Sequence, residues 1–440
     1  MKKVITYGTY DLLHHGHIRL LERAKKLGDY LIVGVTSDDF DRTRGKINVQ
    51  QTLVERIAAV RATGLADLII VEEYEGQKID DIQRYDVDIF TVGSDWEGKF
   101  DYLNDYCKVI YLDRTEGVSS SDIRSNNRSI QIGIIGKSPD FLNKVKNEDI
   151  YVNGVEIAGI CTNDISKHSE DIKRLPLITN NYEVLVKNVD AVYINSEQNE
   201  HYEQIKYALE NGKSVLCESP IDINKNRCKE LFALAKKNNC ILMEAARTAY
   251  STAYSRLLLL LKGGKIGNIV SIDATCTSMK DVGRMKSLLD WGGTALLPIF
   301  QILGTKYKDK RIITKYKNAE KEEDIYTRIE FIYDKSIATI TVAEGAKSEG
   351  ELIITGTKGY LYVPSPWWKT DYFEVRYENQ TDNKRYFYQL DGEGIRYELV
   401  AFARNVQDKK QDNSYISEDV SLEICKVMED FNNKKDLIEI

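Results

Sequence analysis

The chain has 440 residues, of which 42% are hydrophobic and 29% are charged, and its formal net charge is -7. A chain of this length exceeds one ordinary hydrophobic core, so about three domains are expected. The negative net charge argues against a general affinity for nucleic acid or for an anionic membrane, and any polyanion that binds must be small and locally held.

The seven cysteines are scattered, with no CxxC and no short Cys/His spacing, which indicates neither a zinc site nor a disulfide framework. The N-terminal sequence MKKVITYGTYDLL has no apolar signal region. The longest leucine run, 257–261, is far shorter than the roughly 20 residues of a membrane span. We therefore expect a cytoplasmic protein with reduced thiols and no membrane insertion.

Strand-like and helix-like segments alternate over residues 1–128. The β-branched run KVITYG is followed by a helix-type pattern in HIRLLERAKKLG and by a second buried strand, YLIVGVTS. Further strands are predicted at LIIVEE, DIFTVGS and KVIYL, and helices at VERIAAVRATG and KIDDIQRY. Such alternation predicts an α/β domain whose parallel sheet is covered by helices on both faces.

A second alternating series begins after the polar stretch RSNNRS and spans residues 129–246. It starts with the strand IQIGIIG and ends with CILMEA, which predicts a second Rossmann-type domain. Over residues 247–440 the alternation stops. A long helix precedes tyrosine-rich strand segments such as RIEFIYD and YFEVRYE, and a helix closes the chain near SLEICKVMEDF. This region is expected to be an α+β domain with an open, mostly antiparallel sheet.

Three of the five histidines fall within four residues, in the segment GTYDLLHHGHIRLLERAKKLGD. The predicted frame places this motif between a strand end and a helix N-terminus, where unpaired N–H groups and the helix dipole attract phosphate. His14 and His17 can share one face of the first turn, and Gly16 leaves room for a ligand. Two imidazoles there can stabilise the charge of an attacked phosphoryl group. His15 is expected to be structural, and a metal-binding or solvated histidine cluster is the alternative.

Three segments, in the same order, resemble the glycerol-3-phosphate cytidylyltransferase branch of the HxGH nucleotidyltransferases. They are the histidine segment, VGSDWEGKFDYL at 92–103 and YLDRTEGVSSSDIR at 111–124. The resemblance covers residues 1–128 and implies transfer of CMP from CTP to a polyol phosphate, with glycerol 3-phosphate as the first expected acceptor. The CDP-alditol product would serve a cell-surface polymer such as teichoic acid or capsule. Mg²⁺ is implied with the CTP, although no ligand set for it is visible.

The same resemblance assigns roles to residues. Its catalytic set comprises His14, His17, Lys46 and Arg114. Its nucleotide-binding set comprises Thr9, Tyr10, Asp11, Gly16, Asp95, Ser119 and Ser120. Arg56 and Trp96 would contact the acceptor. Structural alternatives stay open: Lys46 as a solvated loop charge, Arg56 as a surface-helix residue and Trp96 as core. Ser119 and Ser120 could be an ordinary helix cap.

Residues 130–440 resemble the Gfo/Idh/MocA family, which includes glucose–fructose oxidoreductases and inositol dehydrogenases. The resemblance is carried by IQIGIIG, DAVYINSEQNEHYEQIKYALENGKSVLCESP, MEAARTAYSTAYSRL and GELIITGTKGYLYVPSPWWKTDYFEV. It implies a dinucleotide-binding Rossmann domain followed by an α+β domain that completes an oxidoreductase site.

The residues of that implied site are degenerate. The dinucleotide turn keeps Gly136 but has Ser138 at the second glycine position. The family's Glu-Lys-Pro motif is Glu-Ser-Pro here, with Glu218 retained and Ser219 unable to supply the lysine charge. The segment at 292–304 has no His or Tyr where the family places its acid/base residue. We expect no hydride transfer, and these losses count against NAD(P) as a cofactor without excluding its binding.

Two other hypotheses for the second half stay open. In the first, the chain is bifunctional, and the second half reduces a keto-sugar phosphate with NAD(P)H to supply the acceptor. In the second, it is a scaffold for oligomerisation or for a partner protein. A homo-oligomer, dimeric or larger, is expected because the open sheet of this fold commonly forms a subunit interface. A class I aminoacyl-tRNA synthetase is disfavoured by the acidic charge and the lack of a KMSKS-like loop.

Overall fold

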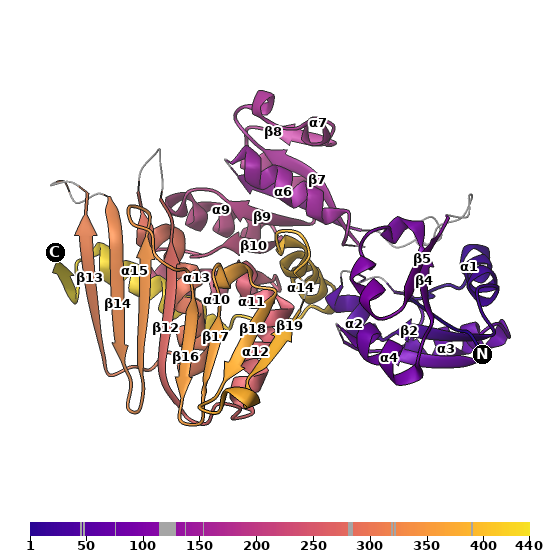
Figure 1. Cartoon of the computed structure of the whole chain (residues 1–440). Coiled ribbons are helices and arrows are strands. Elements are labelled where there is room, and N and C mark those ends of the chain that lie inside the picture. Colours follow the sequence, from indigo (N-terminus) through magenta and orange to yellow (C-terminus); the bar gives the residue numbers. More distant parts are fainter. Residues whose placement is uncertain are drawn as a thin grey trace. The chain divides into compact units, whose positions relative to one another are not determined.

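The computed structural model describes residues 1–44, 46, 49–74, 76–113, 129–136, 138–152, 154–279, 285–317, 320, 323–388 and 390–440. The chain divides into two compact units. The first comprises Met1–Ser129 and Val152–Gly154, and the second comprises Ile130–Tyr151 and Val155–Ile440 (Figure 1). No helix in the described ranges is long and apolar enough to cross a membrane.

Among the described residues of the first unit, five parallel strands form one sheet in the order β3-β2-β1-β4-β5. The strands are β1 (Lys3–Gly8), β2 (Tyr30–Thr36), β3 (Leu68–Glu72), β4 (Ile89–Gly93) and β5 (Lys108–Leu112). The helices are α1 (His15–Lys25), α2 (Asp38–Thr43), α3 (Leu53–Ala62) and α4 (Gln77–Tyr85). The predicted strand and helix alternation is confirmed.

This sheet is buried on both faces because side chains alternate along its central strand. Val4 of β1 packs on one face with Leu21 of α1 and Val60 of α3. Its neighbour Ile5 points to the other face and packs with Ile82 of α4. The near-continuous apolar runs of the sequence follow from this two-sided burial.

The described part of the second unit contains a six-stranded parallel sheet, ordered β11-β10-β9-β6-β7-β8. Its strands are β6 (Ile130–Gly136), β7 (Val155–Cys161), β8 (Leu177–Thr179), β9 (Ala191–Asn195), β10 (Ser214–Glu218) and β11 (Leu242–Ala245). Its helices are α6 (Pro139–Asp149), α7 (Glu170–Lys173), α8 (Tyr182–Lys187), α9 (Gln198–Glu210) and α10 (Lys225–Lys237). The strand order reverses at β6, which pairs with both β7 and β9.

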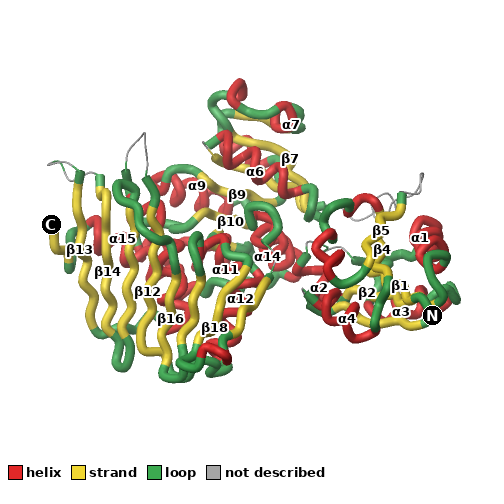
Figure 2. The backbone as a smooth tube through the Cα atoms, in the orientation of Figure 1, coloured by secondary structure: helices red, strands yellow, loops and turns green. Residues whose placement is uncertain are grey.

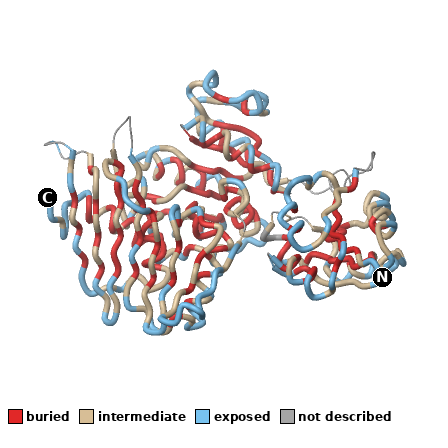
Figure 3. The backbone as a smooth tube through the Cα atoms, viewed as in Figure 1, coloured by how far each residue is buried: buried red, intermediate tan, exposed pale blue. Residues whose placement is uncertain are grey.

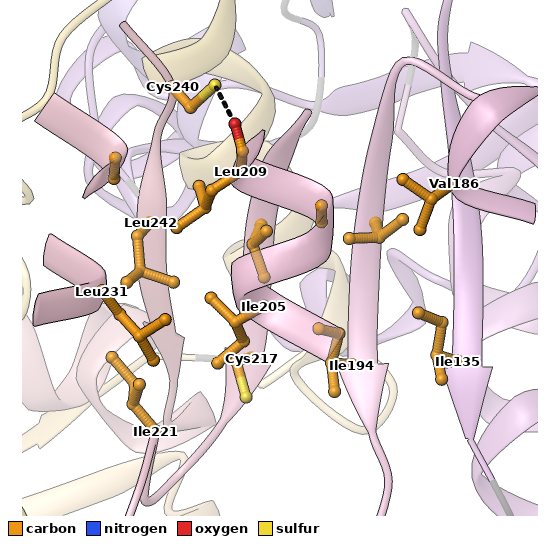
Figure 4. Packing of buried hydrophobic residues seen from close by; sticks show 14 of the residues in the cluster. Ile135, Val186, Ile194, Ile205, Leu209, Cys217, Ile221, Leu231, Cys240 and Leu242 are labelled. Atoms are coloured by element: carbon orange, nitrogen blue, oxygen red, sulfur yellow. Dashed lines mark hydrogen bonds between the residues drawn. The ribbon is translucent and has the colours of Figure 1, made fainter. Parts of the chain in front are cut away.

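One face of this sheet is covered by α8, α9 and α10. Figure 4 shows Ile194 of β9 between Ile135 of β6 and Ile205 of α9, and Leu209 of α9 near Leu242 of β11. Leu231 of α10 belongs to the same layer. The apolar residues that recur along the strands and along the helices therefore pack into one core, as expected of a Rossmann-type domain.

The remaining strands form a nine-stranded sheet among the described residues, in the order β19-β18-β17-β16-β12-β15-β14-β13-β20 (Figure 2). They are β12 (Ile269–Thr277), β13 (Asp309–Tyr316), β14 (Asp324–Ile332), β15 (Ile337–Ala343), β16 (Leu352–Gly356), β17 (Tyr360–Val363), β18 (Tyr372–Arg376), β19 (Lys384–Phe387) and β20 (Leu437–Glu439). The pairs β12/β15 and β13/β20 are parallel and the others are antiparallel, so the mostly antiparallel sheet is confirmed.

The described residues after 246 also form the helices α11 (Arg247–Tyr250), α12 (Thr252–Lys262), α13 (Ser287–Leu303), α14 (Ile395–Asp408) and α15 (Glu418–Asn432). Helix α13 packs on β12, β14 and β15. Along β14, Ile329 and Phe331 are buried, while Arg328 and Glu330, which alternate with them, are half-buried. Figure 3 shows buried and less buried positions alternating along the strands of this sheet, so one sheet face meets the helices. This alternation is typical of a sheet covered on one side.

Candidate functional site

The turn after β1 is tied to the segment that precedes α3. Tyr10 and Leu12 both adopt positive φ angles, 53° and 47°. The fully buried carboxylate of Asp11 accepts hydrogen bonds from the backbone N–H groups of Gln50 and Gln51, at 3.0–3.1 Å. Asp11 therefore fixes the turn that leads into α1, a structural role beside the nucleotide contact that the resemblance implies.

The two histidines of the motif lie together at the start of α1. His14 is the N-cap, and its Nδ1 accepts the N–H of Gly16 at 3.1 Å. The rings of His14 and His17 stack with centroids 4.0 Å apart, and the Tyr10 ring meets His17 edge-on at 5.6 Å. A neutral His14 that accepts at Nδ1 carries its proton on Nε2, which is the donor form that a phosphoryl oxygen requires.

Arg56 supports the turn after β1 through buried hydrogen bonds. Its side chain is fully buried, and it donates to three carbonyl oxygens and two carboxylates. The carbonyl acceptors are those of Thr9 at 2.7 Å, Thr36 at 2.8 Å and Gln51 at 3.1 Å, and the carboxylates are those of Asp38 and Asp41. The surface-helix alternative for Arg56 is wrong, and its contact with an acceptor phosphate stays a prediction.

A cavity of about 80 Å³ lies at the carboxyl ends of β1 to β4. Its lining includes three basic side chains, Arg44, Lys46 and Lys78. Lys46 donates to the hydroxyl of Thr9 at 2.6 Å, and that hydroxyl donates to Asp41 at 2.6 Å. Lys46 is thus held at the cavity by the turn after β1 rather than being a solvated loop charge.

The other two cations share one buried carboxylate. Lys78 is ion-paired with Glu72, and the Arg44 guanidinium lies 3.7 Å from the same carboxylate. Burial alone would raise the pKa of Glu72, but Lys78 and Arg44 together hold that pKa below its usual value. The cavity therefore combines three cations with the carboxylates of Glu72 and Asp41, which gives it an excess of positive charge.

Aromatic rings complete the wall. Trp96 ends the 3₁₀ helix η1 (Ser94–Trp96) after β4, and its ring lies 5.9 Å from the Arg44 guanidinium and from the Phe100 ring. Lys78 lies 4.9 Å from the Tyr7 ring centroid. The predicted acceptor residue Trp96 thus lines the cavity, whereas the neighbouring residue Asp95 is exposed.

The structure thus brings several predicted residues to the end of β1: Thr9, Tyr10, Asp11, His14, Gly16, His17 and Lys46. The predicted Arg114, Ser119 and Ser120 lie outside the described residues. Sequence reasoning missed Arg44 and Lys78. Arg44 stands two residues before Lys46 in RTRGK and could have been found there, but Lys78 looked like one of several polar residues on a surface helix.

The described residues contain no group of three or more His, Cys, Asp or Glu that could hold a metal ion. A Mg²⁺ ion that arrives with CTP is held mainly by the phosphates and needs only one or two protein carboxylates, so Mg²⁺ stays a prediction.

A larger cavity, of about 630 Å³, lies in the second unit at the carboxyl ends of β6, β7 and β9. Gly136 and Pro139 line it where β6 leads into α6. Ser138 is the N-cap of α6, and its hydroxyl accepts the N–H of Phe141 at 3.3 Å. The helix start offers fewer donors than a glycine-rich turn would, because Pro139 has none. The position at the strand-order reversal and the size of the cavity fit a nucleotide.

Glu218 and Ser219, at the end of β10, make contacts unlike those of a lysine-bearing motif. The Ser219 hydroxyl donates to the buried carboxylate of Glu244. An added Cβ on Gly293 of α13 would lie 2.1 Å from the Ser219 Oγ, so this helix packs directly on the serine. Glu244 therefore accepts the hydrogen bond of the Ser219 hydroxyl, and Gly293 fills the space beside it.

Glu218 belongs to a cluster with Tyr193 and Glu398, and the Arg247 guanidinium lies 3.8 Å from its carboxylate. The hydroxyl of Tyr193 lies 2.9 Å from Glu218 and also contacts the buried Glu398. Burial, and then the neighbouring Glu218 carboxylate, raise the pKa of Glu398 to about 8. One hydroxyl hydrogen cannot serve two carboxylates, so a proton retained on Glu398 at neutral pH completes the cluster.

Two family models match the chain: cytidylyltransferase-like over residues 5–126, and oxidoreductase family, NAD-binding Rossmann fold, over residues 130–246. A glycerol-3-phosphate cytidylyltransferase of Bacillus spizizenii is 49% identical over 130 residues, which are 30% of this chain and 100% of that protein. A second such enzyme, of Staphylococcus aureus, is 51% identical over 124 residues, which are 28% of this chain and 93% of that protein.

The second half has more distant relatives. A trans-1,2-dihydrobenzene-1,2-diol dehydrogenase of Xenopus laevis is 28% identical over 233 residues, covering 48% of this chain and 68% of that protein. The structure of a 3-ketoreductase from Actinomadura kijaniata, in complex with NADP and TDP-benzene, matches with a TM-score of 0.64 at 18% identity, covering 71% of this chain and 100% of that one. This structural likeness establishes the fold of the second half.

Proposed function

The chain belongs to the cytidylyltransferase-like family through its N-terminal part and continues into a Gfo/Idh/MocA-type domain, and from this premise we propose that it transfers CMP from CTP to glycerol 3-phosphate. An acceptor phosphate oxygen forms a bond to the α-phosphorus of CTP while the bond to pyrophosphate breaks. The products are a CDP-alditol and pyrophosphate. The N-terminal unit is a nucleotidyltransferase, and the acceptor is the proposed part.

Two observations carry the proposal: the histidine pair at the start of α1 and a separate cation-lined cavity at the carboxyl ends of the strands. With Nδ1 of His14 used as the helix cap, the ring presents its other nitrogen to a ligand. The stacked His17 ring can donate beside it. Hydrogen bonds from two fixed imidazoles to the triphosphate stabilise the charge that develops on the leaving pyrophosphate.

The acceptor phosphate is assigned to the cavity at the ends of β1 to β4. Arg44 and Lys78 would bind it, with Lys46 between the acceptor and the nucleotide. Their common carboxylate, Glu72, already holds two of these cations in place, so little side-chain order has to be gained on binding. The small volume of about 80 Å³ favours a short polyol phosphate over a long one.

The test is pyrophosphate release by the full-length protein with CTP, Mg²⁺ and a panel of acceptors: glycerol 3-phosphate, glycerol 2-phosphate, ribitol 5-phosphate and hexitol phosphates. We expect glycerol 3-phosphate to give the highest kcat/KM. A higher value with ribitol 5-phosphate would retain the transferase and reject the acceptor. No release with any of the acceptors would reject the proposed reaction.

For the second half, we propose a domain that binds a dinucleotide but does not transfer hydride. The family match supports NAD(P) binding, against the doubt that the degenerate turn raised. The occupied position of Ser219, bonded to Glu244 and packed on Gly293, supports the loss of chemistry. Oxidation of NADH or NADPH with a keto-sugar phosphate would instead establish the bifunctional hypothesis. Homo-oligomerisation stays a prediction, and light scattering coupled to size exclusion tests it.

A further inference from the structure

We propose that the 630 Å³ cavity of the second unit selects a dinucleotide whose adenosine ribose carries a free 2′-hydroxyl, NAD(H) rather than NADP(H). The inference rests on the dinucleotide binding proposed for the second half and is independent of the transferase reaction. In a Rossmann-type sheet the pyrophosphate lies at the first helix, here α6, and the adenosine ribose lies beyond the end of the next strand, here β7.

The residues that follow β7 carry an acid at this place. Asp164 lies three residues after the end of β7 and lines the cavity. Its Oδ1 accepts the backbone N–H of Ser166 at 3.1 Å, which fixes the carboxylate at the start of the short 3₁₀ helix there. A carboxylate held in this way can accept a hydrogen bond from a ribose hydroxyl, but it repels a phosphate.

The opposite wall of the cavity is also acidic. Glu200 and Glu203 of α9 both line it, one helical turn apart. Among the lining residues that the structure describes, Lys167 is the one lysine or arginine, and its ammonium lies 3.1 Å from Asp164. A 2′-phosphate, with close to two negative charges, would therefore meet three carboxylates and one ammonium that is already paired.

The one histidine among the described lining residues does not offset this charge. His168 is buried, and its Nε2 lies 2.9 Å from the hydroxyl of Thr162. Burial lowers the pKa of His168, so the imidazole is neutral at pH 7. Hence the residues around the 2′-position of the adenosine ribose carry a net negative charge. Their carboxylates can accept a hydrogen bond from a 2′-hydroxyl.

Isothermal titration of the full-length protein with NADH and with NADPH tests the proposal directly. We expect NADH to bind at least tenfold more tightly than NADPH at low ionic strength, and the gap to narrow with added salt. Equal or tighter binding of NADPH would overturn the proposal. Absence of binding by both dinucleotides at millimolar concentration would overturn it as well.

A charge-reversal variant sharpens the test. Glu203 is exposed, so Glu203→Lys should leave the fold intact while placing an ammonium in the cavity wall. We expect NADPH affinity to rise at least fivefold and NADH affinity to change less than twofold. Glu210→Lys, at the far end of the same helix and outside the cavity lining, is the matched control and should change neither affinity. An equal gain of NADPH affinity in both variants would show a nonspecific charge effect and overturn the assignment.

Discussion

The two cavities occupy the same place in two parallel sheets and carry opposite charges. Each lies at the carboxyl ends of parallel strands, and the second also lies beside the start of a helix, α6. The first is lined by three cations and two carboxylates, and the second by three carboxylates and one cation. Backbone geometry makes both places receptive to a ligand that bears phosphate, and the side chains decide which phosphates each one accepts.

The residues that cap the N-termini of α1 and α6 also differ in what they can offer a ligand. At α1 the cap is the imidazole of His14, which can also serve a ligand through its second nitrogen. At α6 the cap is the hydroxyl of Ser138, followed by Pro139, which has no N–H to offer. The first cap therefore keeps a side-chain donor for a ligand, whereas the start of α6 has one backbone N–H fewer to offer.

Arg56→Met should give the largest effect, because it takes from the buried Asp41 the nearer of its two ion-pair partners and removes the support of the turn after β1. We expect the N-terminal unit to lose about 3 to 5 kcal/mol of unfolding free energy. Urea unfolding monitored together with pyrophosphate release measures it. Arg61→Met on the exposed face of the same helix is the control. Unchanged stability with a raised KM for the acceptor would instead assign Arg56 to acceptor binding.

His17→Ala should lower kcat about 100-fold or more with little change in stability, because it removes one of the two imidazoles that stabilise the triphosphate charge. Steady-state kinetics at saturating CTP measures the loss. The exposed His15 offers a matched control within the same motif, and His15→Ala should keep near wild-type turnover. Similar losses in both variants would mean that the histidine cluster acts through its fold rather than through His17.

Arg44→Gln should raise the KM for glycerol 3-phosphate about tenfold while the KM for CTP changes less than twofold. The reason is that Arg44 lines the cavity assigned to the acceptor and is bound there by Glu72. Initial rates with each substrate varied in turn separate the two constants. A parallel rise of both would place Arg44 at the nucleotide and leave the acceptor cavity without its main cation.

The sequence predicted the strands and helices of the parallel sheets well, because each of these elements is set by a pattern of neighbouring residues. Apolar runs alternating with amphipathic segments identified both parallel sheets, and the spacing of His14 and His17 placed them on one helical turn. Lys78 could not be found in this way. Its partner Glu72 is six residues away in sequence and lies at the end of β3, so only the packed fold shows that the lysine points into the sheet end.

Helix α13 is a second case in which tertiary packing decides. Its sequence contains Gly292, Gly293 and Pro298, which all disfavour a helix interior. The helix forms because its apolar residues are buried against the sheet, and the two glycines permit close approach to Met428 and Ser219. The sequence of this segment alone predicts no helix.

Glu398→Gln should have the smallest effect, and one that depends on pH. With the pKa of Glu398 raised from 4.5 to about 8, the folded protein keeps a proton that the unfolded chain releases. Wild-type stability should therefore fall as pH rises from about 4.5 to about 8 and then level off. Glutamine keeps an acceptor for Tyr193 and cannot ionise, so the variant should lose part of this slope and gain on the order of 1 to 2 kcal/mol over wild type at pH 9. Thermal unfolding midpoints at pH 5.5 and pH 9 measure the difference, with the exposed Glu210→Gln as control. Parallel pH profiles for wild type and Glu398→Gln would show that the carboxyl cluster holds no extra proton. The contrast between the two units would then rest only on the charges of the residues that line their cavities.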